Sequence, residues 1–274
     1  MHYVSHAPAR PLGLFVERLW LFSDAPPHGW ERIVPSGTVE LVINLQEDEI
    51  RIYDSSQSQC CRRFSGAVVS GPYSKCFVID TREHASIIGA HFRAGGAFPF
   101  FVMPVSEFAD THVELETLWG PSAVELRERL CAARTPAERF SLLEKALMSH
   151  LFGPLEGHYA VRFALGAFTS IEAHPSIGQV TEKIGLSQRR LIQVFKKEVG
   201  IPPKLFCRVR RFQRALALMR QNATPNWAHI APQCGYVDQP HFIHDFRSFS
   251  GLTPTEYVRQ RSERVLENHV PLAD

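Results

Sequence analysis

Side chains that can read nucleic-acid bases are concentrated in one short stretch of the C-terminal half of the sequence. This stretch holds Gln188, Arg189, Arg190 and Gln193. Arginine can form two hydrogen bonds with guanine and glutamine two with adenine, and each such pairing discriminates between bases by about 1 to 3 kcal/mol. That chemistry requires a rigid element that holds the side chains in a DNA groove, and the surrounding sequence predicts a helix.

The pattern around this cluster predicts two short helices joined by a tight turn. Ser176 followed by Gln179 is typical of a capping box that opens a helix, and Gly185 is typical of the turn that ends it. A second helix is expected over Gln188–Val199. Its apolar face consists of Leu191, Val194 and Phe195. Two helices with this spacing form a helix-turn-helix, whose second helix can lie in the major groove.

The same pattern returns later in the chain. An offset of 51 residues relates Phe195/Phe246, Lys196/Arg247, Gly200/Gly251, Pro203/Pro254 and Phe206/Tyr257. The turn glycines Gly185 and Gly235 are 50 residues apart. One duplicated unit with an extra residue in its second turn accounts for both offsets. The second unit is then expected to contain helices over Trp227–Cys234, Gln239–Ser248 and Pro254–Arg261.

A long helix, Pro202–Arg220, is expected between the two units, because no helix breaker follows its first turn. Another helix, Tyr159–Ala173, precedes the first unit. Pro232 conflicts with a continuous helix over Trp227–Cys234, since proline lacks the backbone N–H and clashes with the preceding turn. That helix is therefore expected either to start late, near Pro232, or to be kinked before it.

Charge separates the chain into two halves. Residues 1–157 carry 14 Lys and Arg against 19 Asp and Glu, a balance of −5, whereas residues 158–264 carry 16 against 7, a balance of +9. The last ten residues contribute −2, which gives the net charge of +2. This asymmetry favours a basic half that binds a polyanion.

The N-terminal half has the sequence period of strands. Short runs rich in valine, isoleucine and aromatic residues alternate with turn sequences such as Pro35-Ser36-Gly37. The predicted strands are Phe15–Phe22, Val39–Leu45, Glu49–Tyr53, Phe64–Ser70, Cys76–Ile79 and Ser86–Phe92. Their spacing indicates a small antiparallel barrel or sandwich.

Two helices are expected after the strands, over Pro121–Ala132 and Pro136–Leu151. In the second helix an apolar stripe recurs at three- and four-residue steps, at Phe140, Leu143, Leu147 and Leu151. The stripe either packs against the barrel or forms a dimer interface. The prediction is an α+β two-domain protein: a β-rich N-terminal sensor or dimerisation domain over 1–157, an all-α DNA-binding domain over 158–264, and a tail over 265–274.

Residues 159–262 resemble the DNA-binding domain of the AraC/XylS family, which has seven helices and two helix-turn-helix units on one connecting helix. The second unit carries the motif Ile230-Ala231-x-x-Cys234-Gly235-Tyr236-x-Asp238-Gln239-x-His241-Phe242-x-x-Asp245-Phe246-Arg247, followed by Gly251-Leu252-Thr253-Pro254-x-x-Tyr257. The N-terminal half is similar to a sensor-like domain attached to such regulators. That similarity rests on Val34-Pro35-x-Gly37-x-Val39-Glu40-Leu41-Val42-Ile43-Asn44-Leu45 and Gly89-x-His91-Phe92-Arg93-x-Gly95-Gly96.

The resemblance implies which side chains contact DNA. Family members read bases at the positions of Arg189, Ile192 and Gln193 in the first unit, and of Gln239, Pro240 and His244 in the second. Lys196, Lys197 and Arg247 are expected to contact phosphates, and an exposed lysine without a partner is the alternative for Lys197. The full set of predicted DNA-binding residues is Gln188, Arg189, Arg190, Ile192, Gln193, Lys196, Lys197, Gln239, Pro240, His241, His244 and Arg247. His244 stands where family members often carry arginine, and Pro240 can make only apolar contacts. The second unit is therefore expected to discriminate less between bases.

No catalytic residue or cofactor is predicted. His229, His241 and His244 lack a matching set of metal ligands, and so do His84, His91 and His112, which favours a small-molecule pocket or an empty barrel over a metal site. Cys60 and Cys61 are either a redox or metal sensor activated by the neighbouring arginines, or loop thiols without a role. The other four cysteines, expected in the core, are Cys76, Cys131, Cys207 and Cys234.

The sequence therefore predicts a cytoplasmic, sequence-specific transcription regulator and not an enzyme. The expected partners are promoter DNA, a small-molecule effector, RNA polymerase and a second copy of the chain, without membrane association. Two alternatives remain open. One is a ligand-independent architectural dimer, and the other is a DNA-targeted enzyme with a catalytic N-terminal domain. The effector, the target sequence and the sign of regulation are not predicted.

Overall fold

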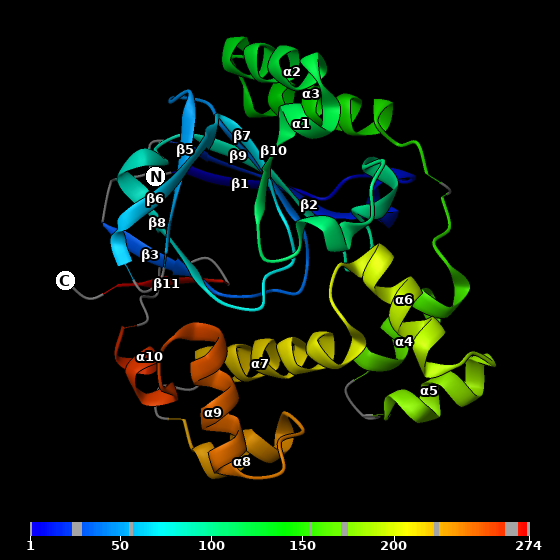
Figure 1. Ribbon diagram of the computed structural model, residues 1–274. Helices are drawn as coiled ribbons and strands as arrows, with labels where there is room; N and C mark the ends of the chain where they lie inside the picture. The colour runs from blue at the N-terminus through cyan, green and yellow to red at the C-terminus, as the bar shows by residue number, and fades with distance from the viewer. Residues whose placement is uncertain are drawn as a thin grey trace.

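The computed structural model describes residues 2–23, 29–54, 57–153, 155–170, 175–221, 225–260 and 268–272. Within these ranges the chain forms a β-rich part with three covering helices and an all-helical part below it (Figure 1). This arrangement confirms the predicted α+β fold class. No helix in these ranges is both long and apolar enough to cross a membrane.

The β-rich part consists of two antiparallel sheets that curl around a common interior. The first has the order β1 (His2–His6), β2 (Val16–Ser23), β9 (Ile87–Phe92), β4 (Glu40–Asn44), β7 (Ala67–Ser70) and β10 (His112–Glu114). The second has the order β11 (His269–Pro271), β3 (Trp30–Ile33), β8 (Phe77–Asp80), β5 (Glu49–Asp54) and β6 (Gln57–Ser65). Every strand pair is antiparallel, as the alternating apolar pattern predicts.

Gly89 allows the centre of the first sheet to pack closely. It lies on β9, where all six residues are buried. A Cβ at this position would lie 2.3 Å from the Trp20 ring and 2.5 Å from the carbonyl oxygen of Leu41. Only glycine fits this close approach of the Trp20 ring and the neighbouring strand.

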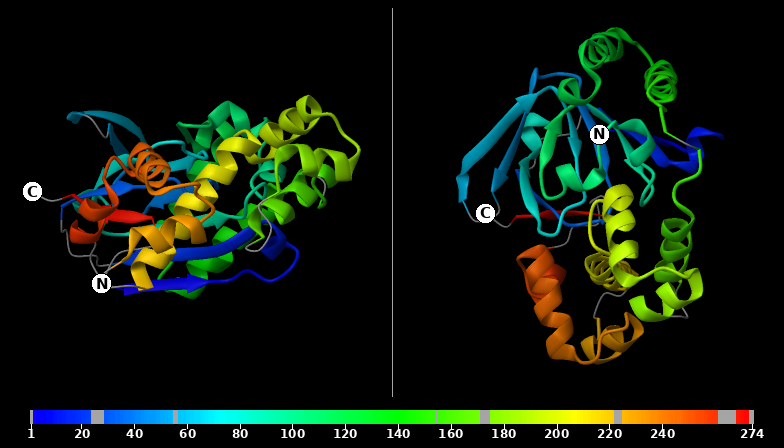
Figure 2. Two further views of the ribbon diagram at one scale, coloured as in Figure 1. Left: turned by 90° about the horizontal axis from the view of Figure 1, so that it is seen from below. Right: turned by 45° about the vertical axis from the view of Figure 1, so that its right-hand side comes forward.

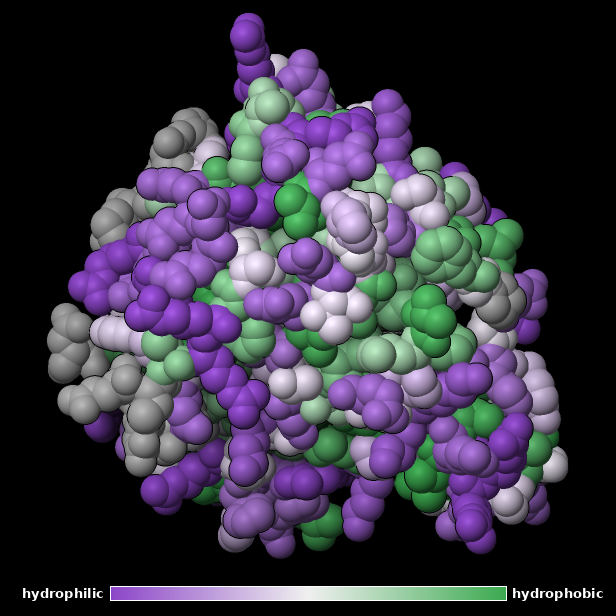
Figure 3. Space-filling model, turned by 45° about the horizontal axis from the view of Figure 1, so that its top comes forward, coloured by the Kyte–Doolittle hydropathy of each residue, from purple (hydrophilic) through white to green (hydrophobic). Residues whose placement is uncertain are grey.

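Three helices cover one side of the barrel. They are α1 (Leu115–Trp119), α2 (Pro121–Ala132) and α3 (Pro136–Ser149). The apolar stripe of α3 packs inward, since Phe140, Leu143 and Leu147 are buried in the barrel core and Leu151 packs against it. Polar side chains cover much of the outer surface over α2 and α3 (Figure 3). The stripe therefore serves barrel packing and does not form an exposed dimer face.

The helical part contains seven helices in its described residues. They are α4 (Tyr159–Thr169), α5 (Ile177–Ile184), α6 (Gln188–Val199), α7 (Pro203–Gln221), α8 (Trp227–Gln233), α9 (Gln239–Ser250) and α10 (Pro254–Gln260). The long helix α7 crosses beneath the barrel, with α4–α6 at one end and α8–α10 at the other (Figures 1 and 2). The two predicted units thus lie at opposite ends of one connecting helix.

Both ends of the helical part pack against the barrel. The C-terminal half of α6 contacts the short 3₁₀ helices η3 (Phe98–Phe100) and η4 (Val105–Phe108). In the middle of α7, the side-chain amide of Gln213 donates a hydrogen bond to the Pro35 carbonyl, with a nitrogen–oxygen distance of 2.5 Å. At the other end the chain returns to the barrel as β11, between β3 and α10.

Several local predictions need correction. The predicted strand Phe64–Ser70 is the end of β6 followed by the separate strand β7, and β1, β3, β10 and β11 were not predicted. Cys61 lies on β6 and not in a loop, whereas the side chain of Cys60 lies outside the described residues. Cys131 is exposed on α2 and Cys207 is half-buried, so only Cys76 and Cys234 fit the prediction of core thiols.

Candidate nucleic-acid interface

The first helix-turn-helix has the local geometry that its sequence predicts. The Ser176 hydroxyl accepts from the Gln179 N–H at 3.2 Å, and the Gln179 side chain accepts from the Ser176 N–H at 2.8 Å, which completes the capping box. Gly185 ends α5 in the left-handed region at φ 69°, where glycine is favoured. The Ser187 hydroxyl then caps α6 by accepting from the Arg190 N–H.

Helix α6 divides its residues between a core face and an exposed face. Leu191 and Phe195 are completely buried, and Val194 and Val199 are nearly so. The exposed residues are Gln188, Arg189, Arg190, Ile192, Gln193, Lys196 and Lys197. All seven predicted DNA-binding residues of the first unit therefore lie on the solvent side of one helix.

Two side chains of this exposed face make contacts within the protein. The Arg190 guanidinium donates to the Gln193 side-chain oxygen at 2.8 Å, so these two candidate base readers restrict each other. The Lys197 ammonium lies 5.2 Å from the centre of the Phe98 ring of η3, within the range of a cation–π contact. Lys197 thus touches the barrel, which the sequence did not predict.

The second helix-turn-helix has the same architecture with different caps. The Asn226 side chain accepts from the Ala228 N–H at 3.0 Å and starts α8 at Trp227. The helix therefore starts where the predicted range Trp227–Cys234 places it, and the alternative of a late start near Pro232 is wrong. Pro232 lies in the last turn of α8, where it removes the hydrogen bond that its own N–H would have donated to the Ala228 carbonyl. Gly235 forms the turn at φ 78°, and the Asp238 carboxylate caps α9 by accepting from the His241 N–H at 2.7 Å.

Helix α9 presents fewer polar groups than α6 at the positions predicted to read bases. Gln239, Pro240, His244 and Arg247 are exposed, whereas His241 is half-buried beside Tyr236. Pro240 occupies the first turn, where its missing N–H removes no hydrogen bond. The predicted residues of the second unit thus share one helix, but only Gln239, His244 and Arg247 extend polar groups freely into solvent.

A buried ion pair connects α9 to α7. The Asp245 carboxylate is 3% exposed and accepts from the Arg208 guanidinium at 2.7 Å. This carboxylate also raises the pKa of Arg208. The pair holds α9 on the connecting helix, so Asp245 supports the second unit and does not face DNA.

A basic groove along α7 was not predicted. Its volume is about 430 Å³, and its walls include Arg210, Arg211, Arg214 and Arg220 together with Thr169 and Ser170 at the end of α4. The spacing of the arginines at one-, three- and six-residue steps could have indicated a basic face. The helix was predicted from its lack of a breaker, without use of its charged residues.

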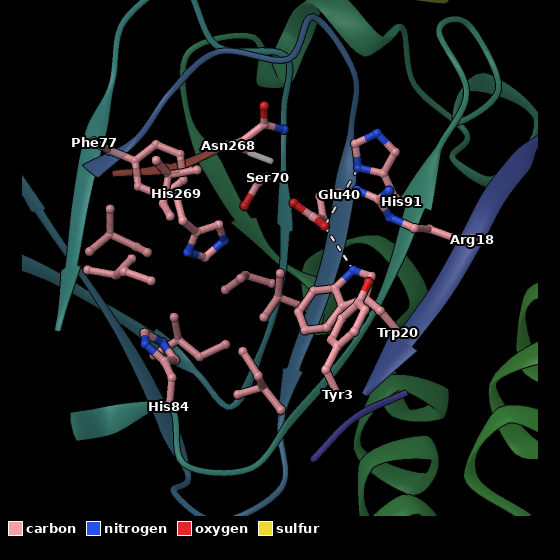
Figure 4. A pocket seen from close by; sticks show the side chains of 17 residues that line it. Tyr3, Arg18, Trp20, Glu40, Ser70, Phe77, His84, His91, Asn268 and His269 are labelled. Carbon is pink, nitrogen blue, oxygen red and sulfur yellow. Dashed lines mark hydrogen bonds and ion pairs between the residues drawn. The ribbon is translucent and has the colours of Figure 1, made fainter. Parts of the chain in front are cut away.

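The barrel encloses a cavity of about 90 Å³. Its walls are mainly aliphatic and aromatic, with polar groups from several strands. Figure 4 shows Phe77, His84 and His269 on one side of it and Trp20, Glu40 and His91 on the other. Of the three barrel histidines, His84 and His91 line the cavity and His112 does not. The described residues contain no group of three or more His, Cys, Asp or Glu side chains suited to a metal ion.

The polar end of the cavity carries an ionised carboxylate. Glu40 accepts from the Trp20 indole N–H at 2.9 Å, and His91 lies 3.7 Å from the same oxygen. Burial acts to raise the pKa of Glu40, but the nearby histidines and the indole N–H outweigh it, so the pKa lies below its ordinary value. Burial lowers the pKa of His84, which leaves its ring neutral at pH 7.

Comparison with known proteins supports both halves of this description. Residues 180–260 match a family described as "Helix-turn-helix domain", and residues 4–114 match one described as "Domain of unknown function (DUF6597)". These ranges correspond to the two helix-turn-helix units and to the barrel.

Curated relatives match this chain over part of its length. HTH-type transcriptional activator RhaS of Escherichia fergusonii is 29% identical over 122 residues, which are 44% of this chain and 39% of that protein. HTH-type transcriptional regulator ArgR of Pseudomonas aeruginosa is 28% identical over 92 residues, 34% of this chain and 28% of that protein. The match thus spans less than half the length of these relatives.

Solved structures show a similarity over part of the chain. A probable AraC family transcriptional regulator from Rhodopseudomonas palustris is 28% identical, with a TM-score of 0.34, over 37% of this chain and 96% of that one. With its paired helix-turn-helix units, the C-terminal half of the chain is thus similar to helix-turn-helix transcription regulators.

Proposed function

We propose that this protein is a sequence-specific, DNA-binding transcription regulator whose N-terminal barrel responds to a small molecule. The observation that carries the proposal is the pair of helices α6 and α9, each with an exposed polar face and each preceded by a glycine turn, at the two ends of α7. At 19 residues, α7 is about 28 Å long. That length is close to the ~34 Å between successive major-groove segments on one face of DNA.

The two kinds of DNA contact have different sources. Arg189, Gln193 and their neighbours on α6 supply base contacts, and Lys196, Lys197 and Arg247 supply phosphate contacts. The arginines of the α7 groove add positive charge between the two units. The first unit gives most of the sequence discrimination, because α9 offers a proline and a histidine where α6 offers arginine and glutamine.

The test is selection of bound sequences from a random DNA pool by the full chain. The expected result is a site with two specified segments about one helical turn apart, and with the stronger base preference in one of them. Enrichment of no sequence over the starting pool would contradict the proposal. A site with only one specified segment would contradict the use of both units.

The cavity favours a sensor over the architectural alternative. A barrel that only joined two copies of the chain would need no internal space lined by Glu40, His91 and apolar walls. A ligand that binds only the folded state raises its stability, so a thermal-shift screen of the full chain against small molecules separates the two. Homodimerisation and contact with RNA polymerase belong to the proposal, and no catalytic step is part of it.

A further inference from the structure

The basic groove along α7 lies between the two ends of the helical part. Helix α7 forms its floor. Thr169 and Ser170, at the end of α4, form one wall, and Cys234, at the end of α8, contributes to the other. A molecule in the groove would therefore lie between the two helix-turn-helix units.

Arg210 and Arg214 lie on the side of α7 that faces away from α9. Arg208 pairs with Asp245 of α9, and Phe212 packs against the aromatic rings of the same helix. Each arginine of the groove follows one of these two residues by two positions, which is about 200° of rotation in an α-helix. The groove and α9 are thus on opposite sides of α7.

The polar faces of both recognition helices also point away from α7. His244 of α9 is exposed two positions before Phe246, whose ring packs against α7. Gln193 of α6 is exposed two positions before Phe195, whose ring also packs against α7. Because α7 is the floor of the groove, DNA that lies on these polar faces leaves the groove open.

The positive charge of the groove is not neutralised by carboxylates in the described part of the chain. No aspartate or glutamate lines the groove, and no described carboxylate pairs with Arg210, Arg211 or Arg220. The guanidinium of Arg211 lies 5.3 Å from the centre of the Tyr236 ring, and its buried Nε has no acceptor among the described residues. Since like charges repel, an anion between these arginines would be stabilising.

The spacing of the arginines indicates more than one anionic group. Arg210 and Arg214 are four residues apart, or about 6 Å along the helix axis, and Arg220 lies about 15 Å from Arg210. A single phosphate or carboxylate cannot reach all of them. The planar guanidinium forms paired hydrogen bonds with phosphate oxygens, so a chain of linked phosphates fits this row.

The groove also has room and apolar surface for an organic group. Its volume of about 430 Å³ falls within the ~300 to 1,000 Å³ of small-molecule sites. Phe168, Pro175 and Ala217 supply apolar surface in its lining. Linked phosphates on an organic body that can pack against such a surface describe a nucleoside polyphosphate.

We propose that this groove is a ligand site in the helical half of the chain and that it binds a nucleoside polyphosphate. Arg210, Arg211 and Arg214 bind the phosphates, and the apolar surface that includes Phe168 packs against the nucleoside. The site is separate from the barrel cavity and from the predicted DNA contacts. The chain therefore binds the nucleotide and DNA at the same time.

The experiment is calorimetric titration of the full chain with ATP, at constant ionic strength and without divalent cations. Adenosine, tripolyphosphate and citrate are titrated in parallel. ATP should bind as one molecule per chain, tripolyphosphate and citrate should bind at least about tenfold more weakly, and adenosine should show no binding.

Each comparison can overturn part of the proposal. Absence of ATP binding would overturn the site. Equal binding of citrate would mean that the groove attracts any multivalent anion, and equal binding of tripolyphosphate would overturn the role of the apolar surface. Binding of adenosine as tight as that of ATP would overturn the role of the arginines.

Variants of α7 locate the binding. Arg210→Gln and Arg211→Gln should each weaken ATP binding by at least about tenfold, because each removes a charge-assisted contact with phosphate. Arg210 is exposed, so its replacement leaves the packing of α7 intact. Lys204→Gln removes the same charge from an exposed position on the same helix outside the groove, and should bind ATP as the parent does. Equal weakening by Lys204→Gln, or none by Arg210→Gln, would refute the proposal.

DNA provides the last arm of the test. The chain saturated with its selected DNA site should bind ATP with nearly unchanged affinity, whereas displacement of the DNA by ATP would place the nucleotide on the recognition helices and overturn the groove site. A chain that binds ATP through Arg210 but selects no DNA sequence contradicts only the proposed function. A chain that selects DNA but does not bind ATP contradicts only this inference.

Discussion

The two helix-turn-helix units share a pattern but close their cores in different ways. The buried residues of the first unit's cluster all come from α4–α7 and the turns between them. The cluster of the second unit includes Val34 and Cys76 from the barrel and Val270 from β11. The fully buried core of the first unit therefore comes from its own helices, with Ala94 and Ala109 of the barrel packed against it, whereas the buried core of the second unit includes residues of the N-terminal half and of β11.

This difference has a counterpart on the DNA side. The unit whose buried core comes from its own helices carries the arginines and glutamines predicted to read bases, and the unit that shares its buried core with the barrel carries a proline and a histidine at the corresponding positions. From this comparison we expect the two units to differ in role. The first unit recognises the DNA sequence, and the position and stability of the second unit depend on the barrel. The following predictions test the comparison, from the largest expected effect to the smallest.

Asp245→Ala should destabilise the second unit by about 3 kcal/mol, because it leaves the Arg208 guanidinium without its buried partner. Because Arg208 is about one-third exposed, the loss of stability should lie at the lower end of the range seen when one partner of a buried ion pair is removed. Hydrogen exchange of the full chain should show lost protection in α9 with little change in α6. Equal loss of protection in both helices would mean that the two units unfold as one.

Acid should weaken the barrel and the second unit together. His112 is buried among aromatic rings, and burial lowers its pKa to about 3. Below the ordinary value of 6.5 the unfolded chain binds a proton that the folded barrel does not, so stability falls as the pH drops from 6.5 toward 3. Between pH 6.5 and 4.5 this loss is about 2 kcal/mol.

The measurement is denaturant unfolding at several pH values, with hydrogen exchange in β7, α6 and α9 corrected for intrinsic rates. His112→Gln should remove most of the pH dependence in this window. Protection in α9 should follow that in β7, since Val34 and Cys76 belong to both parts. If α6 followed β7 more closely than α9 does, the comparison between the units would be reversed.

Arg189→Ala should cost more DNA affinity than His244→Ala. Loss of a two-hydrogen-bond contact corresponds to about 1 to 3 kcal/mol, or about 5- to 150-fold, with relaxed preference at one base position. His244 is exposed, and its replacement by alanine should lower DNA affinity by less than tenfold. The measurement is binding of both variants to the selected site and to single-base variants of it. A larger loss for His244→Ala would assign the main recognition to the second unit.

Lys196→Ala should have the smallest effect and no sequence dependence. Removal of one phosphate contact should weaken all DNA sequences alike and flatten the slope of log affinity against log salt by about one. Lys145→Ala on α3 makes the same change in net charge away from both recognition helices and should leave the slope unchanged. The same slope for both variants would exclude a phosphate contact at Lys196.

The helical half was predictable because its signals are local. Caps, turn glycines and apolar spacing determined the bounds of α6 without error and those of α5, α7 and α9 to within a few residues. Helix α8 shows the limit: the sequence predicted its start at Trp227 but left open a late start near Pro232, and only the structure shows that Pro232 lies in the last turn of a helix capped by Asn226. Cys131 was predicted as buried from apolar neighbours, but the helix turns it outward.

The barrel cavity could not be predicted in the same way, because its lining comes from distant parts of the chain. Trp20, Glu40 and His84 meet only after the strands pair. The C-terminal strand is the clearest case, since three residues, His269–Pro271, are too short to be recognised as a strand without their partner β3. Their role depends on a contact across more than two hundred residues of sequence.

Helix α7 also sets a rotational phase between the two recognition helices. Each residue of an α-helix adds about 100° of rotation and about 1.5 Å of length, so inserting one residue into its 19 would turn the second unit toward a different side of the duplex. Four inserted residues would nearly restore the angle while lengthening the spacing by about 6 Å. Because β11 and the Gln213–Pro35 contact hold α7 at fixed points on the barrel, neither insertion could preserve both the phase and the docking. The length of this helix is thus constrained twice, once by the pitch of DNA and once by the barrel.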